Sequence, residues 1–140
     1  MRWGYRVVMP LKSDPANWTD PRHRCGVAGE EVARQFLERQ GWVVMSHRFR
    51  VGRLEVDLIA RNGSLVAFIE VKTRRGTAFG SPFEAVTWQK KREIVRVAQG
   101  WMERFGRPGD VYRFDVIGVT MAGPVTSVQH VADAFRPGWR

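Results

Sequence analysis

Two apolar segments separated by a turn signal constrain the fold of this chain most strongly. Residues 54–60 read Leu-Glu-Val-Asp-Leu-Ile-Ala and residues 65–72 read Leu-Val-Ala-Phe-Ile-Glu-Val-Lys, with Arg61-Asn62-Gly63-Ser64 between them. Runs of Val, Ile, Leu and Phe favour strands, and Asn-Gly between two such runs is the strongest short-range signal for a β-hairpin. The sequence therefore predicts an antiparallel hairpin centred on Asn62 and Gly63.

A two-residue turn at Asn62-Gly63 sets the expected register of this hairpin. It places Asp57 opposite Phe68 and Glu55 opposite Glu70, so that Asp57 and Glu70 are diagonal neighbours with Cβ atoms roughly 7 Å apart. Successive side chains of a strand point to opposite faces, and directly paired residues share a face. Four charged side chains are then expected on one face: Glu55, Asp57, Glu70 and Lys72.

The chemistry of this charged face permits two interpretations. Carboxylates held close together repel each other unless a cation lies between them, and hard oxygen ligands suit Mg²⁺ or Mn²⁺. Lys72 could orient a water nucleophile or offset charge on a phosphate, which is an arrangement for phosphodiester hydrolysis. The other interpretation is a solvated strand face, because acidic residues that alternate with apolar ones are common on antiparallel strands.

Helical spacing of apolar residues predicts two helices. The first begins at Pro21, after Thr19-Asp20, and ends at Gly41. The second begins with a capping box of Ser81 and Glu84, with Pro82 at its first position, and ends at Gly106. Aromatic residues at helical spacing usually pack, so the two tryptophans of the second helix are expected in the core or in a groove wall: Trp88 and Trp101.

Three further strands are expected at residues 42–45, 112–119 and 125–131. Residues 1–19 show no helix or strand period and are expected to form an extended, partly mobile lead-in to one domain over residues 20–140. The fold class is therefore α/β, with a mixed sheet flanked by helices.

Charge and cysteine usage narrow the partners and the compartment. With 23 Lys and Arg against 14 Asp and Glu, the formal net charge is +9, which favours a polyanion such as nucleic acid. A single cysteine, Cys25, cannot form an internal disulfide, and the three histidines are not spaced for structural zinc. No segment has the length and apolarity of a signal-peptide core or a membrane span. We therefore expect a cytoplasmic protein with no membrane partner.

Six ordered motifs between residues 24 and 135 resemble the YraN family of bacterial proteins. They are Gly29-Glu30 with Ala33 and Leu37, residues 54–60, residues 68–74, residues 79–82, Ala85-Val86 with Lys90, and residues 113–116. Members of this family are placed in the PD-(D/E)xK nuclease superfamily and are similar in fold to archaeal Holliday-junction resolvases. The resemblance implies a restriction-endonuclease-like fold and a metal-dependent nuclease or nuclease-like DNA-processing protein. DNA is favoured over RNA as the partner, but the sequence leaves the choice between them open.

The resemblance also implies roles for individual residues. Asp57 and Glu70 match metal ligands for Mg or Mn, Lys72 matches the catalytic lysine, and Glu30 would complete the acidic site. Three basic residues are expected to contact nucleic acid: Arg74, Arg75 and Lys90. The chain departs from the family pattern twice, with Leu54 in place of Gly and with Arg48 in place of an Asn.

Three functional hypotheses stay open from the sequence. The chain is a nuclease, a binding module that grips nucleic acid without cutting it, or an adaptor for a DNA-processing protein. The substrate structure, the polarity of cutting and the oligomeric state are not encoded in any motif of the chain.

Overall fold

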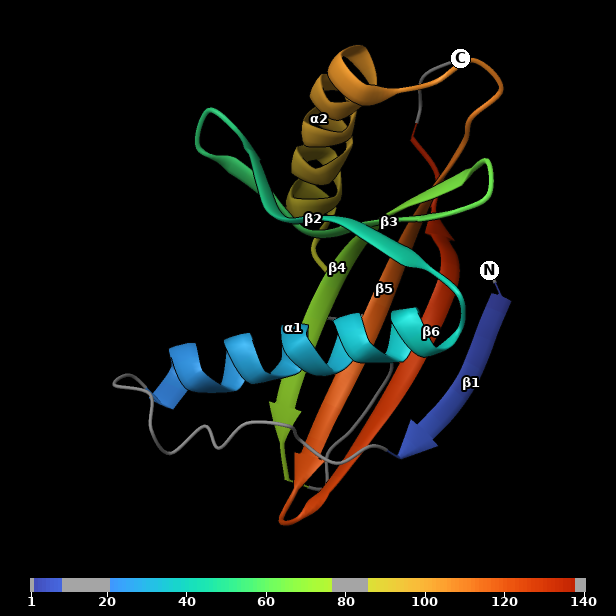
Figure 1. Cartoon of the computed structure of the whole chain (residues 1–140). Helices are drawn as coiled ribbons and strands as arrows, with labels where there is room; N and C mark the ends of the chain where they lie inside the picture. Colours follow the sequence, from blue (N-terminus) through green and yellow to red (C-terminus); the bar gives the residue numbers. More distant parts are fainter. Residues whose placement is uncertain (1, 9–20, 77–85, 138–140) are drawn as a thin grey trace.

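A six-stranded sheet organises the chain (Figure 1). The computed structural model describes residues 2–8, 21–76 and 86–137. The strands follow the order β1-β6-β5-β4-β3-β2 across the sheet. They are β1 (Arg2–Val8), β2 (Val43–Val51), β3 (Leu54–Asn62), β4 (Leu65–Arg75), β5 (Val111–Ala122) and β6 (Val125–Phe135). The helices are α1 (Pro21–Arg39), between β1 and β2, and α2 (Trp88–Phe105), between β4 and β5.

The sheet is mixed because one of its strand pairs is parallel. β4 pairs with β5 in parallel, and α2 lies in the connection between them, whereas the other neighbouring strands pair antiparallel. A parallel pair needs such a crossover, because a short turn cannot return the chain to the same end of the sheet. The predicted α/β class with a mixed sheet and flanking helices is confirmed, and it is compatible with a restriction-endonuclease-like fold.

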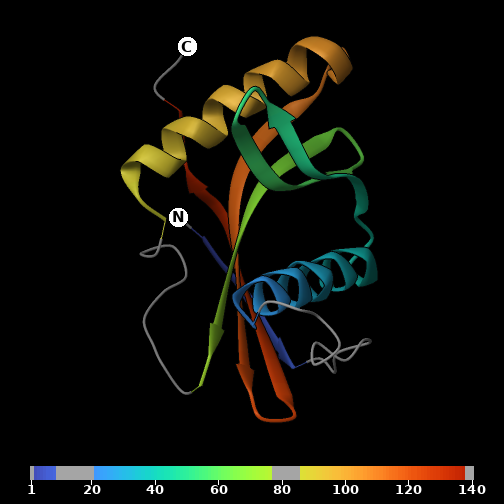
Figure 2. The ribbon, with the colours of Figure 1, turned by 90° about the vertical axis from the view of Figure 1, so that its left-hand side faces the viewer.

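The alternation of side chains along the strands builds one core on each face of the sheet. In β4, Ala67, Ile69 and Val71 pack in the cluster that contains α1, whereas Val66 and Phe68 pack in the cluster that contains α2. Figure 2 views the long strands close to edge on and shows α1 on one side of them. Because side chains alternate along a strand, Glu70 and Lys72 belong to the same face as Phe68.

The β3–β4 hairpin turns one residue later than predicted. Asn62 pairs with Leu65, so the two-residue turn is Gly63-Ser64 rather than Asn62-Gly63. Gly63 has a φ of 64°, whereas Asn62 and Ser64 do not have positive φ. A positive φ at the first central residue alone is the pattern of a type II′ turn, which needs glycine there. The expected pairs of Asp57 with Phe68 and of Glu55 with Glu70 are therefore wrong.

Three other element boundaries differ from the predictions. β2 extends to Val51, well beyond the short strand expected at residues 42–45, and Arg2–Val8 forms β1 although no strand period marks it. α2 begins only after Thr87, whose side chain accepts a hydrogen bond from the Lys90 backbone. The expected capping box at residues 81–84 lies outside the described residues. The expected end of α2 at Gly106 and the span of α1 agree with the structure.

β3 leaves β4 close to Asp57 and follows β2 instead. The last recorded β3–β4 pair is Leu58 with Ile69, whereas β3 pairs with β2 as far as Leu54. This outer part of the β2–β3 hairpin packs on α2, where Val51 lies so close to Gly100 that a Cβ there would be 2.7 Å from Val51 Cγ2. The divergence opens the sheet beside Asp57 and Glu70.

Candidate active site

Asp57 lies at the point where β3 and β4 separate. Its Oδ2 accepts a hydrogen bond of 2.8 Å from the backbone N–H of Val71, the residue after Glu70. Beyond the Leu58–Ile69 pair the amides of β4 no longer find the β3 backbone, and a carboxylate supplies the acceptor for one of them. The observed register, continued by one position beyond the Leu58–Ile69 pair, sets Asp57 directly opposite Glu70 rather than in the diagonal position that the sequence predicts.

Glu70 is a buried carboxyl group, one oxygen of which has no hydrogen-bond partner. Its residue is 4% exposed, and its Oε1 is buried with no hydrogen-bond partner. Burial first and the neighbouring Asp57 second raise the pKa of Glu70 to about 8. Burial also raises the pKa of Asp57, although hydrogen bonds from Glu70 and from the Val71 amide act in the opposite direction. Burial therefore disfavours ionisation of both groups, and the neighbouring Asp57 disfavours ionisation of Glu70 further, whereas Glu70 favours ionisation of Asp57.

Two lysines provide positive charge to this carboxyl pair. Lys72 Nζ lies 3.5 Å from Glu70 Oε2, two residues further along β4 and on the same face. Lys90, from the first turn of α2, donates a hydrogen bond of 3.3 Å to the backbone oxygen of Glu55. Its charge favours ionisation of both Asp57 and Glu70. Side chains from three elements therefore meet here: Asp57, Glu70, Lys72 and Lys90.

Glu30 reaches the edge of this group from α1, on the other side of the sheet. Its charge raises the pKa of Asp57, so the two carboxylates are within electrostatic range. The Glu30 side chain itself is paired with β2: its Oε1 lies 2.6 Å from His47 Nε2 and accepts a 3.0 Å hydrogen bond from Arg48 Nε. Its role as a third metal ligand stays a prediction.

Gly29 allows α1 to approach the sheet at this place. A Cβ on Gly29 would lie 1.8 Å from Oγ1 of Thr73 in β4, which is far inside van der Waals contact. Glycine is therefore required for the close approach that brings Glu30 toward the carboxyl pair. The order Gly29-Glu30 therefore has a physical reason: Gly29 allows a short distance between α1 and β4, and Glu30 supplies the negative charge.

The carboxyl pair fits a hard divalent cation. The two carboxyl groups are in contact, and one of them has a buried oxygen without a hydrogen-bond partner. A cation that coordinates both would stabilise their ionised forms. Within residues 21–76 and 86–137, no three His, Cys, Asp or Glu side chains are grouped closely enough to hold a metal ion. Asp57 and Glu70 would hold such a cation between them, with further positions left to water, to substrate oxygens or to the predicted third ligand, Glu30.

Comparison with known proteins places the chain in a family. The sequence pattern of the uncharacterised protein family UPF0102 matches residues 29–119. The chain belongs to UPF0102. UPF0102 is the YraN family, so the resemblance found in the sequence is confirmed.

Similar UPF0102 proteins cover most of this chain. One from Rhodococcus jostii is 42% identical over 111 residues, which are 79% of this chain and 94% of the relative. One from Geobacter sulfurreducens is 40% identical over 111 residues, or 79% of this chain and 87% of the relative. One from Nitratidesulfovibrio vulgaris is 36% identical over 116 residues, or 83% of this chain and 87% of the relative.

Arg48, where the resemblance leads us to expect an Asn, lies at a position with a special backbone. It has a φ of 56°, a left-handed conformation that Asn adopts more readily than Arg. The family's Asn therefore suits the backbone, whereas Arg48 adds hydrogen bonds to Glu30. Sequence analysis missed both this pairing and His47. The only available signal was the Asn-to-Arg departure itself.

A second buried ionic cluster lies outside the carboxyl pair. Asp115 is 0% exposed and accepts two hydrogen bonds of 2.8 Å from Arg113. His130 Nε2 lies 2.7 Å from Asp115 Oδ2, and the backbone of Asp133 donates to Oδ1. Burial opposes the charge of Asp115, but these partners outweigh it and lower the pKa of the carboxyl. The cluster joins β5 to β6, so Asp115 has a structural role.

Arg74 and Arg75 continue β4 beyond Lys72. Arg75 is exposed and Arg74 is half-buried.

Neither α1 nor α2, the helices of the described ranges, is both long and apolar enough to cross a membrane.

Proposed function

We propose that the protein is a metal-dependent nuclease that hydrolyses phosphodiester bonds of nucleic acid, DNA in preference to RNA, in the cytoplasm. The observation that carries the proposal is the buried carboxyl pair of Asp57 and Glu70 with Lys72 beside it. Strongly perturbed carboxyl groups next to a positioned cation are more common at catalytic sites than on solvated strand faces. A solvated face would not bury Glu70 to 4% exposure.

Each residue of the group has a role in this proposal. Asp57 and Glu70 would hold Mg²⁺ or Mn²⁺, which when bound lowers the pKa of water and neutralises charge on a phosphate oxygen. Lys72 is kept on the substrate side by its 3.5 Å contact with Glu70, and its ammonium would stabilise negative charge that develops on the scissile phosphate. Lys90 would contact the same phosphate from α2.

Support for a nucleic-acid substrate comes from charge. The chain carries a formal net charge of +9, and Arg74 and Arg75 follow the catalytic segment directly. Arginines and lysines that contact phosphates release condensed counterions, which favours binding. A binding module without activity and an adaptor for a DNA-processing protein remain the alternatives, and no feature of the site favours either.

The test is a cleavage assay on a panel of labelled single-stranded, duplex, flapped and four-way-junction DNAs. The protein is incubated with Mg²⁺, with Mn²⁺ or with chelator. We expect cutting that depends on the metal and is abolished by Asp57→Asn. Absence of cutting on every substrate, with a folded and metal-loaded protein, would refute the proposal.

Lys72→Ala separates catalysis from metal binding. A protonated ammonium has no lone pair and does not coordinate a cation, so metal affinity should be retained. The cleavage rate should fall by about 10²-fold, as for loss of one positioned charge. Arg104→Ala is the matched control, because Arg104 is exposed near the end of α2, away from the carboxyl pair and outside the α2 groove, and lies over the Phe105 ring. If Lys72→Ala cuts at the wild-type rate, the catalytic assignment of this lysine is wrong.

A further inference from the structure

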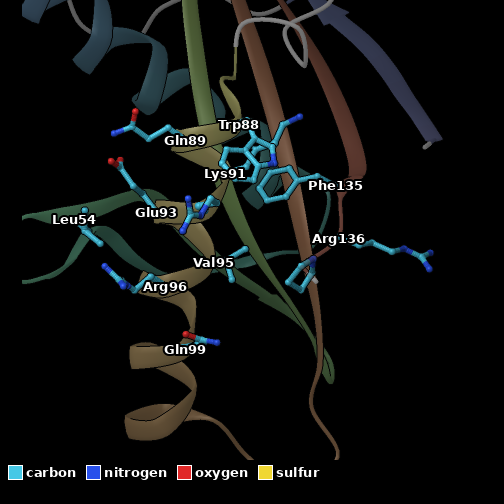
Figure 3. A pocket seen from close by; sticks show the side chains of 12 residues that line it. Leu54, Trp88, Gln89, Lys91, Glu93, Val95, Arg96, Gln99, Phe135 and Arg136 are labelled. Atoms are coloured by element: carbon cyan, nitrogen blue, oxygen red, sulfur yellow. The ribbon is translucent and has the colours of Figure 1, made fainter. Parts of the chain in front are cut away.

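A groove lies along the outer surface of α2, beside the candidate active site and separate from it. Its volume is about 780 Å³, and Figure 3 shows its lining side chains, which come from α2, from Leu54 of β3 and from the end of β6. Leu54 directly precedes Glu55, whose backbone oxygen receives the Lys90 hydrogen bond. The groove is therefore joined to the carboxyl pair through the first turn of α2 and the start of β3.

The groove is positively charged. Four cationic side chains line it: Lys91, Arg92, Arg96 and Arg136. Glu93 is the one carboxylate among the lining residues of this groove. Arg136 is also paired with Asp133, at 2.8 Å, whereas Arg92 and Arg96 are exposed on the helix. Such a surface complements a polyanion.

Trp88 is exposed in this charged groove. Its residue is 72% exposed and lines the groove, which is one of the two positions expected for it, whereas Trp101 is 3% exposed and lies in the core, the other expected position. The guanidinium carbon of Arg92 lies 4.8 Å from the centre of the Trp88 ring. A large apolar ring left in water costs free energy, so a ligand that covers it is favoured.

We infer that this groove binds a single-stranded segment of nucleic acid, with a base stacked on Trp88 and phosphates held by Arg92, Arg96 and Lys91. Aromatic side chains beside basic residues are the common means of holding single strands, because any unpaired base offers a flat face. The bases of a duplex are already stacked on each other and offer no such face to Trp88. The inference rests on the proposed function for the identity of the substrate class.

The position of the groove gives the inference a functional meaning. α2 presents Lys90 to the carboxyl pair and, from the neighbouring residues, Trp88 and Lys91 to the groove. A single strand in the groove would therefore lead toward the place where Asp57 and Glu70 act. The substrate class that follows is a nucleic acid with a single-stranded part next to the bond that is cut.

Binding is measured with a short fluorescein-labelled oligothymidylate, by anisotropy, on Asp57→Asn protein in chelator so that no cleavage occurs. Trp88→Ala should weaken affinity by roughly ten-fold or more, and Trp88→Phe should restore most of it. A blunt duplex should bind equally with and without Trp88. Thermal melts establish that each variant is folded, which is expected because Trp88 is exposed.

Charge is tested separately with inorganic polyphosphate and with a salt series. Arg96→Gln should weaken oligothymidylate and polyphosphate binding alike and reduce the salt dependence by about 0.7 in log-log slope, as for one lost phosphate contact. Arg104→Gln is the matched control, since Arg104 is exposed on the same helix outside the groove. Trp88→Ala should leave polyphosphate binding unchanged.

The outcomes separate this inference from the proposed function. If Trp88→Ala binds oligothymidylate like the parent protein, or weakens duplex and polyphosphate equally, the stacking groove is refuted even where cleavage is found. If Trp88→Ala weakens the single strand selectively while the wild type cuts none of the DNA panel, the groove is supported and the nuclease proposal fails.

Discussion

Replacing Glu70 by Gln measures how much the buried carboxyl pair destabilises the metal-free protein. The pKa of Glu70 rises from 4.5 to about 8, because of burial and then of Asp57. Between these two pH values the unfolded chain loses the Glu70 proton and the folded protein keeps it. The unfolded state then binds fewer protons, so the free energy of unfolding falls as pH rises.

The size of the effect follows from the width of this window. At 1.36 kcal/mol per pKa unit, the fall from pH 4.5 to about pH 7 amounts to about 3 kcal/mol. Gln keeps the shape and cannot ionise, so Glu70→Gln should be more stable than the wild type near neutral pH by about 3 kcal/mol. For a domain of this size that is on the order of 10 °C in melting temperature. Near pH 4 the two proteins should be almost equally stable.

The assay is urea denaturation in chelator at about pH 4 and about pH 7, followed by fluorescence. Glu103→Gln is the control, because Glu103 is exposed on α2 and its replacement changes the net charge equally. If wild type and Glu70→Gln lose stability in parallel between the two pH values, Glu70 is ionised in the folded protein. The argument from burial is then refuted.

Three further experiments test separate parts of the structure. Mg²⁺ or Mn²⁺ should raise the melting temperature of the wild type but not of Asp57→Asn, because a ligand that binds the native state stabilises it by mass action. Differential scanning fluorimetry with and without chelator measures this difference. Gly29→Ala should lower the free energy of unfolding by about 1–3 kcal/mol, because its Cβ would lie 1.8 Å from Thr73 Oγ1. In urea titrations, the double variant with Thr73→Ala should recover part of that free energy. Asp115→Asn should cost about 3–5 kcal/mol by leaving Arg113 and His130 without their buried carboxylate, and equal unfolding midpoints would contradict this.

The shared face of Asp57 and Glu70 could be predicted even though the hairpin turn was misplaced. Moving a two-residue turn by one position slides the partner strand by two, and side chains alternate with a period of two. Asp57 and Glu70 therefore stay on a common face in either register. Their closeness was not predicted, because the turn was expected one residue too early: the observed register brings Asp57 directly opposite Glu70 instead of diagonal to it.

Other parts of the site depend on tertiary contacts that leave no local pattern. Glu30 finds His47 and Arg48 because α1 and β2 meet in space, and nothing within α1 encodes these partners. The start of α2 was misjudged because a capping box is a stronger sequence signal than Thr87, which lacks an acidic residue three positions later. That same boundary leaves Trp88 at the exposed first turn of α2 rather than in the core.

β1 has a consequence for the solubility of the molecule. It pairs antiparallel with β6, whose eleven residues would otherwise form an open flank of the sheet. An open strand presents unpaired N–H and C=O groups that recruit strands of other molecules. The edge of the sheet therefore moves from β6 to β1, which is shorter, has a register shift between Trp3 and Arg6 and carries two arginines, and these features hinder pairing with other molecules. A shortened protein that starts at α1 would expose the longer β6 edge to aggregation while keeping Asp57, Glu70 and Lys72.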